Sequence, residues 1–298
     1  NLFFTFLFFF AYYNYLKMLY HIPNIYLSNN SLFAFLIIII LIYFFCIHVK
    51  YWISPHYMSS STFPTFKTFV INLDKDRIKQ QNFVNAYHNS DMNHIQLKRF
   101  PAINGKNVIT DKWLTPSSTT ELKTVLSKGF RTHHYQLTPG AVGCFISHYT
   151  LAKQLLNDTS TESYLIFEDD ISINPHAYRK LKKLLHYAPP DWDMITFHTH
   201  RVLAKHINKH FTKVDGFWGM TMYLIHKRGA KKFVDYVDNH RIDGQVDAYL
   251  SKMGQQGLIN IYSSKVNLCT NIAHDTNIQM KIIPSHGQNP FLYQGYLV

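Results

Sequence analysis

The chain is poor in cysteine and in acidic residues. Its 298 residues contain three cysteines, Cys46, Cys144 and Cys269. An odd and small number provides no disulfide framework, so cysteine usage does not indicate the redox compartment. Only 18 acidic residues face 30 lysines and arginines, which gives a formal net charge of +12 with histidine neutral. This excess suits an anionic small ligand, an anionic membrane or nucleic acid.

Patterns typical of nucleic-acid binding are absent as well. The sequence has no zinc-finger spacing, no RNP-like run and no block of Lys and Arg. We therefore expect no nucleic-acid partner. Hydrophobic residues are plentiful, at 47% of the chain, which allows a packed core and excludes wholesale disorder.

A long uncharged apolar run lies near the N-terminus. Residues 32–47 read LFAFLIIIILIYFFCI, and with their flanks they reach the roughly 20 residues that a helix needs to cross a bilayer core. We interpret residues 32–52 as a single transmembrane signal anchor and the Ser-, Thr- and Pro-containing residues 53–64 as a stem. Residues 1–31 form an N-terminal segment in which Met18 is a candidate start, so that part of it would be untranslated. A buried core helix is the alternative for the apolar run.

From residue 65 to residue 298, strand-like and helix-like segments alternate. Short apolar runs rich in β-branched residues predict strands at residues 67–73, 95–100, 164–167, 194–197 and 219–226. Apolar residues at helical spacing predict helices at residues 74–88, 138–155, 176–187 and 228–239. This alternation predicts an α/β domain with a mainly parallel sheet.

Three consecutive carboxylates, Glu168, Asp169 and Asp170, follow directly after the predicted buried strand at 164–167. In open α/β sheets, ligands bind beyond the carboxyl ends of the strands. Adjacent carboxylates repel one another, and a divalent cation such as Mg²⁺ or Mn²⁺ relieves that repulsion while it also binds substrate phosphates. The acids alone would equally suit a solvated strand edge or a helix cap.

Two further pairs of side chains are weaker candidates for a metal site or a catalytic site. His206 and His210 would share one face of a helix, as zinc ligands can. Cys144 and His148 are four residues apart and could form a thiol–imidazole pair, but the sequence suggests no third residue to orient them. We rank both below the acidic triplet.

Six segments, in order, resemble glycosyltransferase family 25, which includes bacterial lipooligosaccharide glycosyltransferases and animal procollagen galactosyltransferases. They are FVINLDKDRIKQQNF (69–83), RFPAINGK (99–106), PGAVGCFISHYTLAKQLL (139–156), YLIFEDD (164–170), MTMYLIHKRGAKKFVD (220–235) and IDGQVDAYL (242–250). The resemblance covers most of the chain after the stem and leaves the anchor outside.

The resemblance implies a GT-A fold, a Rossmann-like α/β sandwich, and an inverting transfer that depends on Mn²⁺ or Mg²⁺. A hexose, galactose or glucose, would pass from a UDP-sugar to a hydroxyl acceptor on a glycan, as in lipopolysaccharide biosynthesis, or on a protein. The alternative is a catalytically inactive, membrane-tethered relative that binds glycans or a partner; the complete acidic triplet argues against it.

The resemblance also implies roles for individual residues. Asp169 and Asp170 would hold the metal, and Asp247 would be the general base, with Asp243 a close second. The residues expected to contact the donor are Asn72, Asp74, Arg77, Ser147, His148 and Glu168. Met222 stands where the family usually has a small residue, which leaves the identity of the sugar open.

A single-pass anchor ahead of such a domain is typical of ER and Golgi transferases. We therefore expect a membrane protein of type II orientation, with a lumenal domain if the source is a eukaryote. Lys50 and Lys67 follow the apolar run, and the positive-inside rule mildly favours the opposite orientation.

Overall fold

The computed structural model describes residues 64–108, 110–272 and 280–283. The predicted N-terminal segment, the anchor at 32–52 and the stem apart from Pro64 lie outside the described residues, so their interpretation stays a prediction. Within the described ranges, no helix is both long enough and apolar enough to cross a membrane.

Strands and helices alternate as expected for an α/β domain. The strands are β1 (Phe66–Asn72), β2 (Leu97–Pro101), β3 (Ser163–Glu168), β4 (Ile171–Ile173), β5 (Met194–His206), β6 (Phe211–His226), β7 (Ile261–Ser264) and β8 (Cys269–Asn271). The helices are α3 (Arg77–His88), α4 (Thr110–Trp113), α5 (Pro116–Lys128), α6 (Pro139–Asn157), α7 (Ala177–Leu185), α8 (Lys227–His240) and α9 (Val246–Gln255), with a 3₁₀ turn η1 (Gly105–Asn107).

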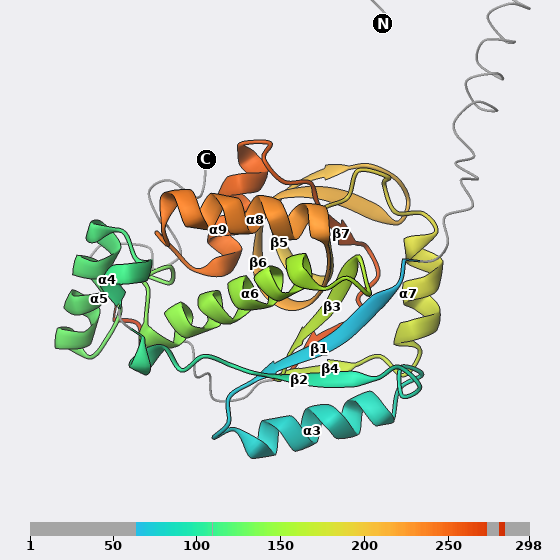
Figure 1. The fold of residues 1–298 in the computed structure, drawn as a ribbon, viewed down its shortest axis with the longest axis horizontal. Helices are drawn as coiled ribbons and strands as arrows, with labels where there is room; N and C mark the ends of the chain where they lie inside the picture. Colours follow the sequence, from blue (N-terminus) through green and yellow to red (C-terminus); the bar gives the residue numbers. More distant parts are fainter. Residues whose placement is uncertain (1–63, 109, 273–279, 284–298) are drawn as a thin grey trace, which may run out of the picture. The chain divides into compact units, whose positions relative to one another are not determined.

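A mixed sheet forms the centre of the domain (Figure 1). Among the described residues it has six strands in the order β2-β1-β3-β6-β5-β7. Strand β1 runs parallel to β2 and β3, and β5 runs parallel to β7. Strand β6 is antiparallel to β3, β5 and β7. The predicted α/β class is confirmed, with β6 as the antiparallel strand in an otherwise parallel arrangement.

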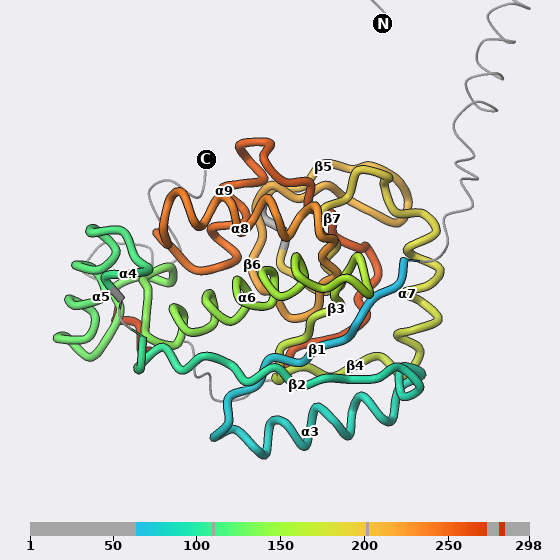
Figure 2. The backbone as a smooth tube through the Cα atoms, in the orientation of Figure 1, coloured from blue at the N-terminus to red at the C-terminus, as the bar shows by residue number. Residues whose placement is uncertain are grey.

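Helices cover both faces of the sheet and so enclose two cores. Successive residues of a strand point alternately into one core and the other. Tyr164 and Ile166 of β3 lie in one core, together with buried side chains from α6, α8 and α9. Leu165 and Phe167 lie in the other core, with residues of α3 and α7. The path of α6 above β1 and β3 can be followed along the backbone in Figure 2. Burial on both faces explains why YLIF reads as a continuous apolar run in the sequence.

The hairpin of β5 and β6 is longer than the sequence predicts. The expected strands at 194–197 and 219–226 continue over Met194–His206 and Phe211–His226. Register shifts interrupt their pairing beyond Thr196, and such bulges break the two-residue alternation by which a strand is recognised.

The expectation that His206 and His210 share a helix face is wrong. His206 ends β5 and His210 immediately precedes β6, so both flank the turn of this hairpin. His206 Nδ1 lies 2.7 Å from Lys265 Nζ, and the His210 ring stacks on Tyr187 at a centroid distance of 4.2 Å. Each ring thus has a local partner in the described chain, and the two do not form a ligand pair.

A buried carboxylate ties the sheet to α8. The Asp193 side chain is fully buried and accepts bonds from Arg228 Nε at 2.7 Å, Lys232 Nζ at 2.5 Å and the Asn260 amide at 2.8 Å. Burial opposes the charged form, but the bonds from Lys232, Asn260 and Arg228 outweigh it and lower the pKa of Asp193. Removing this charge would leave the donors without an ionic partner.

We expect Asp193→Asn to lower the free energy of unfolding at neutral pH by about 3 kcal/mol. Because the folded pKa lies below the ordinary value of 3.8, the ionised carboxylate contributes its full stability above that value and loses it as the pH falls through the lowered pKa. Urea unfolding over a pH series should therefore show the difference between wild type and variant shrinking toward acid. The matched control is Asp235→Asn, which removes an exposed pair with Lys231 and should cost less than about 0.5 kcal/mol; equal losses in both variants would contradict the assignment.

Candidate functional site

Two neighbouring parallel strands end together at one edge of the sheet. Ile71 of β1 is paired with Glu168 of β3, so Asn72 and the acidic triplet emerge at the same place. Strand β3 ends at Glu168, and β4 begins only at Ile171. Asp169 and Asp170 therefore lie in the link between two strands, where successive side chains need not point to opposite faces of the sheet. This is the position at which open α/β sheets bind ligands.

The acidic triplet separates two cavities formed by described residues. The first, the β1 cavity, has a volume of about 250 Å³ and is lined by the end of β1, the start of α3, the turn η1 and α6. The second, the β6 cavity, has a volume of about 230 Å³ and is lined by residues 218–221 of β6, the start of α9 and residues 134–135. Cys144, Glu168 and Asp170 line both cavities, so the carboxylates form the wall between them.

The β1 cavity combines lysines with a fixed amide. Lys75, Lys79 and Lys106 contribute to its lining among the described residues. Asn72 is buried, and its Nδ2 donates to Asp169 Oδ2 at 2.6 Å while its Oδ1 accepts from Arg99 Nε at 3.0 Å. Cationic side chains beside an oriented amide suit a ligand with several anionic oxygens.

These lysines are functional candidates that sequence reasoning missed. Lys75 and Lys79 follow the end of β1 along the chain, and Lys106 follows the turn glycine Gly105. Their position after a strand and after a Gly turn was the available signal, but a chain with 30 lysines and arginines offers many such positions.

The pKa values of the two aspartates of the acidic triplet are raised. Burial, together with the charges of Glu168 and Asp169, raises the pKa of Asp170 to about 7. Burial also raises the pKa of Asp169, although the bond from Asn72 opposes it. Asp170 Oδ1 is buried and has no hydrogen-bond partner among the described residues. Clustered, partly desolvated carboxylate oxygens of this kind fit a hard divalent cation, which prefers oxygen ligands.

Asp247 lines the β6 cavity together with Glu168 and Asp170. It stands in the first turn of α9, where its Oδ2 accepts from the Gly219 amide at 3.0 Å and its Oδ1 accepts from the Ala248 amide at 2.8 Å. Gly219 has φ of 89°, a conformation that favours glycine and that directs its amide to the carboxylate. Burial raises the pKa of Asp247 in spite of these two backbone bonds.

The other predicted site residues lie outside both cavities. Asp74 is exposed and pairs with Arg99, and Arg77 is exposed at the start of α3. Ser147 is buried; its hydroxyl donates to Gly143 O at 2.7 Å and accepts from the Ile103 amide at 2.8 Å, which fastens the segment before η1 to α6. Asp243 pairs with Lys252 Nζ at 2.6 Å. The residues that the structure brings together are Asn72, His148, Glu168, Asp169, Asp170 and Asp247, and their roles stay predictions.

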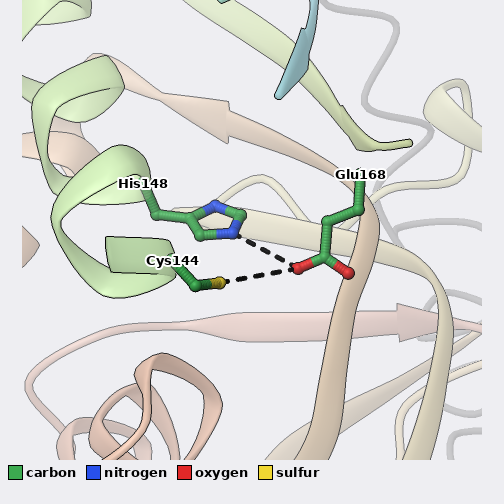
Figure 3. Close-up of side chains that lie close together, drawn as sticks. All are labelled: Cys144, His148 and Glu168. Carbon is green, nitrogen blue, oxygen red and sulfur yellow. Dashed lines mark hydrogen bonds and ion pairs between the residues drawn. The ribbon is translucent and has the colours of Figure 1, made fainter. Parts of the chain in front are cut away.

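Cys144 and His148 lie close together, and Glu168 contacts both side chains (Figure 3). Glu168 Oε1 lies 3.4 Å from His148 Nε2 and 3.9 Å from Cys144 Sγ. The other ring nitrogen of His148 lies 2.8 Å from the Tyr223 hydroxyl. Burial, followed by the charges of Glu168, Asp247 and Asp170, raises the pKa of the Cys144 thiol well above its usual value. A thiol held neutral is a poor nucleophile, which argues against a thiol hydrolase.

A carboxylate edge between a lysine-lined cavity and a second cavity that contains Asp247 suits a phosphate-bearing ligand bound beside a second ligand. The model of glycosyltransferase family 25 (LPS biosynthesis protein) matches residues 65–250, and the chain therefore belongs to this family. The resemblance carried by the six sequence segments is thus confirmed.

Curated relatives agree with this assignment. Procollagen galactosyltransferase 2 of Homo sapiens is 27% identical over 177 residues, which cover 56% of this chain and 27% of the human protein. Procollagen galactosyltransferase 1-B of Xenopus laevis is 27% identical over 210 residues, which cover 66% of this chain and 32% of the frog protein. The chain thus spans about a third or less of the length of these relatives.

Similarity to solved structures is weaker. The crystal structure of A197 from STIV has a TM-score of 0.36 and 9% identity, covering 76% of this chain and 99% of that one. A glycosyltransferase involved in the glycosylation of the major capsid of PBCV-1 has a TM-score of 0.29 and 13% identity, covering 59% and 68%. TM-scores this low establish no shared fold.

The β1 cavity depends on a close approach of η1 to α6. A Cβ on Gly143 would lie 2.2 Å from Ile103 O and 2.6 Å from the Gly105 nitrogen, and a Cβ on Gly105 would lie 1.6 Å from Pro139 O. These contacts involve backbone atoms, which cannot move aside as a side chain can.

We expect Gly143→Ala to lower the free energy of unfolding by about 1–3 kcal/mol, because the added methyl group overpacks this contact. Gly254→Ala in α9 is the matched control, since its Cβ would lie 3.4 Å from Val214 O. Alanine is the better helix former at both positions, so the control should be neutral or stabilising. Urea unfolding of the two variants tests the contact, and a neutral Gly143→Ala would contradict it.

Proposed function

We propose that this family 25 domain transfers a hexose, galactose or glucose, from a UDP-sugar to a hydroxyl of a glycan or protein acceptor, with inversion and on a GT-A-like scaffold. The observation that carries the proposal is the acidic triplet standing between the lysine-lined β1 cavity and the β6 cavity with Asp247. The names of the procollagen galactosyltransferases support a hexose donor and leave the acceptor of this chain open.

The β1 cavity is the proposed donor site. Lys75, Lys79 and Lys106 would pair with the diphosphate oxygens, and the buried amide of Asn72 would hold Asp169 in place beside them. Arg99 fixes Asn72 from the far side through its bond to Oδ1 at 3.0 Å. Orientation of a carboxylate by such an outer partner keeps it ready to bind a cation.

Asp169 and Asp170 are the proposed ligands of Mn²⁺ or Mg²⁺. The buried Asp170 Oδ1, which has no hydrogen-bond partner among the described residues, supports this fit. When bound, such a cation neutralises negative charge on the departing diphosphate.

Asp247 is the proposed general base in the β6 cavity. It would accept the proton of the acceptor hydroxyl as that oxygen bonds to the anomeric carbon and the bond to the diphosphate breaks. Its raised pKa makes it a stronger base than an ordinary aspartate, and the amides of Gly219 and Ala248 fix its orientation. Inversion would require the acceptor oxygen to reach the anomeric carbon directly, from the side opposite the departing diphosphate.

Aromatic side chains support a glycan or glycosylated acceptor. Tyr135 and Trp218 line the β6 cavity, with ring centroids 6.1 Å apart. Rings of this kind offer flat apolar surface beside polar groups, which suits the apolar face of a sugar ring.

We further propose that the apolar run at 32–47 anchors the domain to a membrane in type II orientation.

We expect Asp247→Asn to lower kcat by about 10²- to 10⁴-fold with little change in donor KM, since the amide cannot accept the proton. In the wild type, kcat/KM should fall as the pH drops through the raised pKa of Asp247, because the protonated acid is inactive as a base. Asp243→Asn, which changes a residue outside both cavities, should cost far less, and Asp235→Asn serves as the surface control. A larger loss in Asp243→Asn than in Asp247→Asn would reverse the assignment.

Asp170→Asn tests the donor side. We expect it to weaken Mn²⁺ binding, measured by titration calorimetry, by more than the roughly 10- to 100-fold that loss of an outer-shell partner costs. Hydrolysis of UDP-galactose or UDP-glucose in the presence of Mn²⁺ should fall in parallel, while the unfolding midpoint without metal stays within the wild-type range or rises as charge repulsion is relieved.

A screen of UDP-sugars against the wild-type chain, with Mn²⁺ or Mg²⁺, distinguishes the proposal from its alternative. Turnover of one UDP-hexose supports the transferase. Binding of glycans without turnover of any nucleotide sugar would instead indicate a catalytically inactive glycan-binding relative.

A further inference from the structure

Three side chains that line the β1 cavity bring sulfur, nitrogen and oxygen ligand atoms together. Cys144 Sγ, His148 Nε2 and a Glu168 carboxylate oxygen all lie within 4.8 Å of one another. Figure 3 shows the thiol and the ring both directed at the same carboxylate oxygen. Cys144 and His148 are four residues apart on α6, which places them on one face of the helix, and Glu168 approaches from the end of β3.

His148 supplies an independent sign of a missing ligand. Its side chain is 1% exposed, and its Nε2 makes no hydrogen bond within the described part of the chain. Its Nδ1 is paired with the Tyr223 hydroxyl at 2.8 Å. A buried imidazole that is fixed through one nitrogen and directs the other at a thiol and a carboxylate matches the usual arrangement of a metal-bound histidine and its outer partner.

We propose that Cys144, His148 and Glu168 form a site for a thiophilic divalent cation, with Zn²⁺ as the best fit. This site is distinct from the hard-cation site proposed at Asp169 and Asp170, and it does not depend on the transferase function. Zn²⁺ binds sulfur at about 2.3 Å and nitrogen or oxygen at about 2.0–2.2 Å, so the edges of a tetrahedral site measure about 3.4–3.6 Å. The distances from Glu168 Oε1 to Nε2, 3.4 Å, and to Sγ, 3.9 Å, are close to these edges. The third edge, from Nε2 to Sγ, is at most 4.8 Å, so binding would draw the thiol and the ring together.

The chemistry of these ligands discriminates between cations. A thiolate and an imidazole favour Zn²⁺ or Co²⁺, whereas Mg²⁺ and Mn²⁺ prefer oxygen ligands. Binding replaces the Cys144 S–H bond by a metal–sulfur bond and releases that proton to solvent. The Nδ1–H of His148 then donates to the Tyr223 oxygen, which leaves the Nε2 lone pair for the metal.

The bound cation would join α6 to the end of β3. Glu168 begins the acidic triplet, so this link would fix the start of the carboxylate wall. Because Cys144 and Glu168 line both cavities, a fourth ligand position would remain open to water or to a small ligand, as in three-residue zinc sites.

Titration of the metal-free full chain with Co²⁺ tests the proposal directly. We expect a near-ultraviolet thiolate-to-Co²⁺ charge-transfer band, with the intense visible bands of a four-coordinate ion, at one equivalent. Zn²⁺ should abolish both and raise the unfolding midpoint, whereas a large excess of Mg²⁺ should change neither. Absence of the thiolate band in the wild type, or displacement of Co²⁺ by Mg²⁺, would overturn the proposal.

Variants then identify the ligands. Cys144→Ser should remove the thiolate band, and His148→Asn and Glu168→Gln should weaken Zn²⁺ binding by more than about 100-fold, beyond the cost of an outer partner. Tyr223→Phe, which alters only the outer partner, should weaken it by about 10- to 100-fold. Cys269→Ser is the matched control, since Cys269 is the other free cysteine among the described residues, and it should keep the band and the affinity.

Folding of each variant is checked without metal by circular dichroism and thermal unfolding. If Cys144→Ser does not fold, Glu168→Gln decides the question, because it keeps the thiol and changes a partly exposed, nearly isosteric group. Undiminished Zn²⁺ affinity in a folded Glu168→Gln, or loss of the thiolate band in Cys269→Ser, would refute the assignment of ligands.

Discussion

Repulsion among the adjacent carboxylates at the end of a buried strand is the constraint on which the site depends. Burial, together with the charges of Glu168 and Asp169, raises the pKa of Asp170 to about 7. In the structure, each of the three carboxylates has different surroundings. Asp169 receives the Asn72 amide at 2.6 Å, Glu168 faces His148, and Asp170 keeps a buried oxygen without a hydrogen-bond donor among the described residues.

Helix α6 holds this arrangement from one side. Its N-terminal part contains Gly143, against which the backbone before η1 packs, and Ser147, whose hydroxyl bonds the Ile103 amide. The next residue, His148, faces Glu168. Helix α6 therefore contributes to the lining of both cavities and contacts Glu168 between them. A shift of α6 would alter both cavities together.

The sequence predicted well those elements whose signals are local. The helix from Thr138 and Pro139 has a side-chain cap and an N-terminal proline, and Thr138 accepts from the Ala141 amide as expected for a cap. The run at 164–167 is buried on both faces and could be recognised from composition alone. The chain beyond Thr196 could not be recognised, because its pairing with β6 is bulged and its residues are a mixture of histidine, lysine and apolar side chains.

Site residues divide in the same way. The acidic triplet was predictable because its strand ends where the charges begin. The contacts of Glu168 with Cys144 and His148 were not predictable, since they join residues 24 and 20 positions apart in sequence through the packing of α6 on β3. The sequence placed Asp247 only narrowly ahead of Asp243 as the base. The fold distinguishes them more sharply, because Lys252 pairs with Asp243, whereas Asp247 lines the β6 cavity.

The antiparallel strand β6 accounts for the second cavity. A parallel strand beside β3 would bring another carboxyl end to the acidic edge, followed by a crossover connection. Strand β6 instead passes this edge in mid-strand, and Gly219, with φ of 89°, presents its amide there. That amide donates to Asp247 at 3.0 Å, so the reversal of one strand helps to hold a carboxylate from a late helix in the same cavity as Glu168 and Asp170.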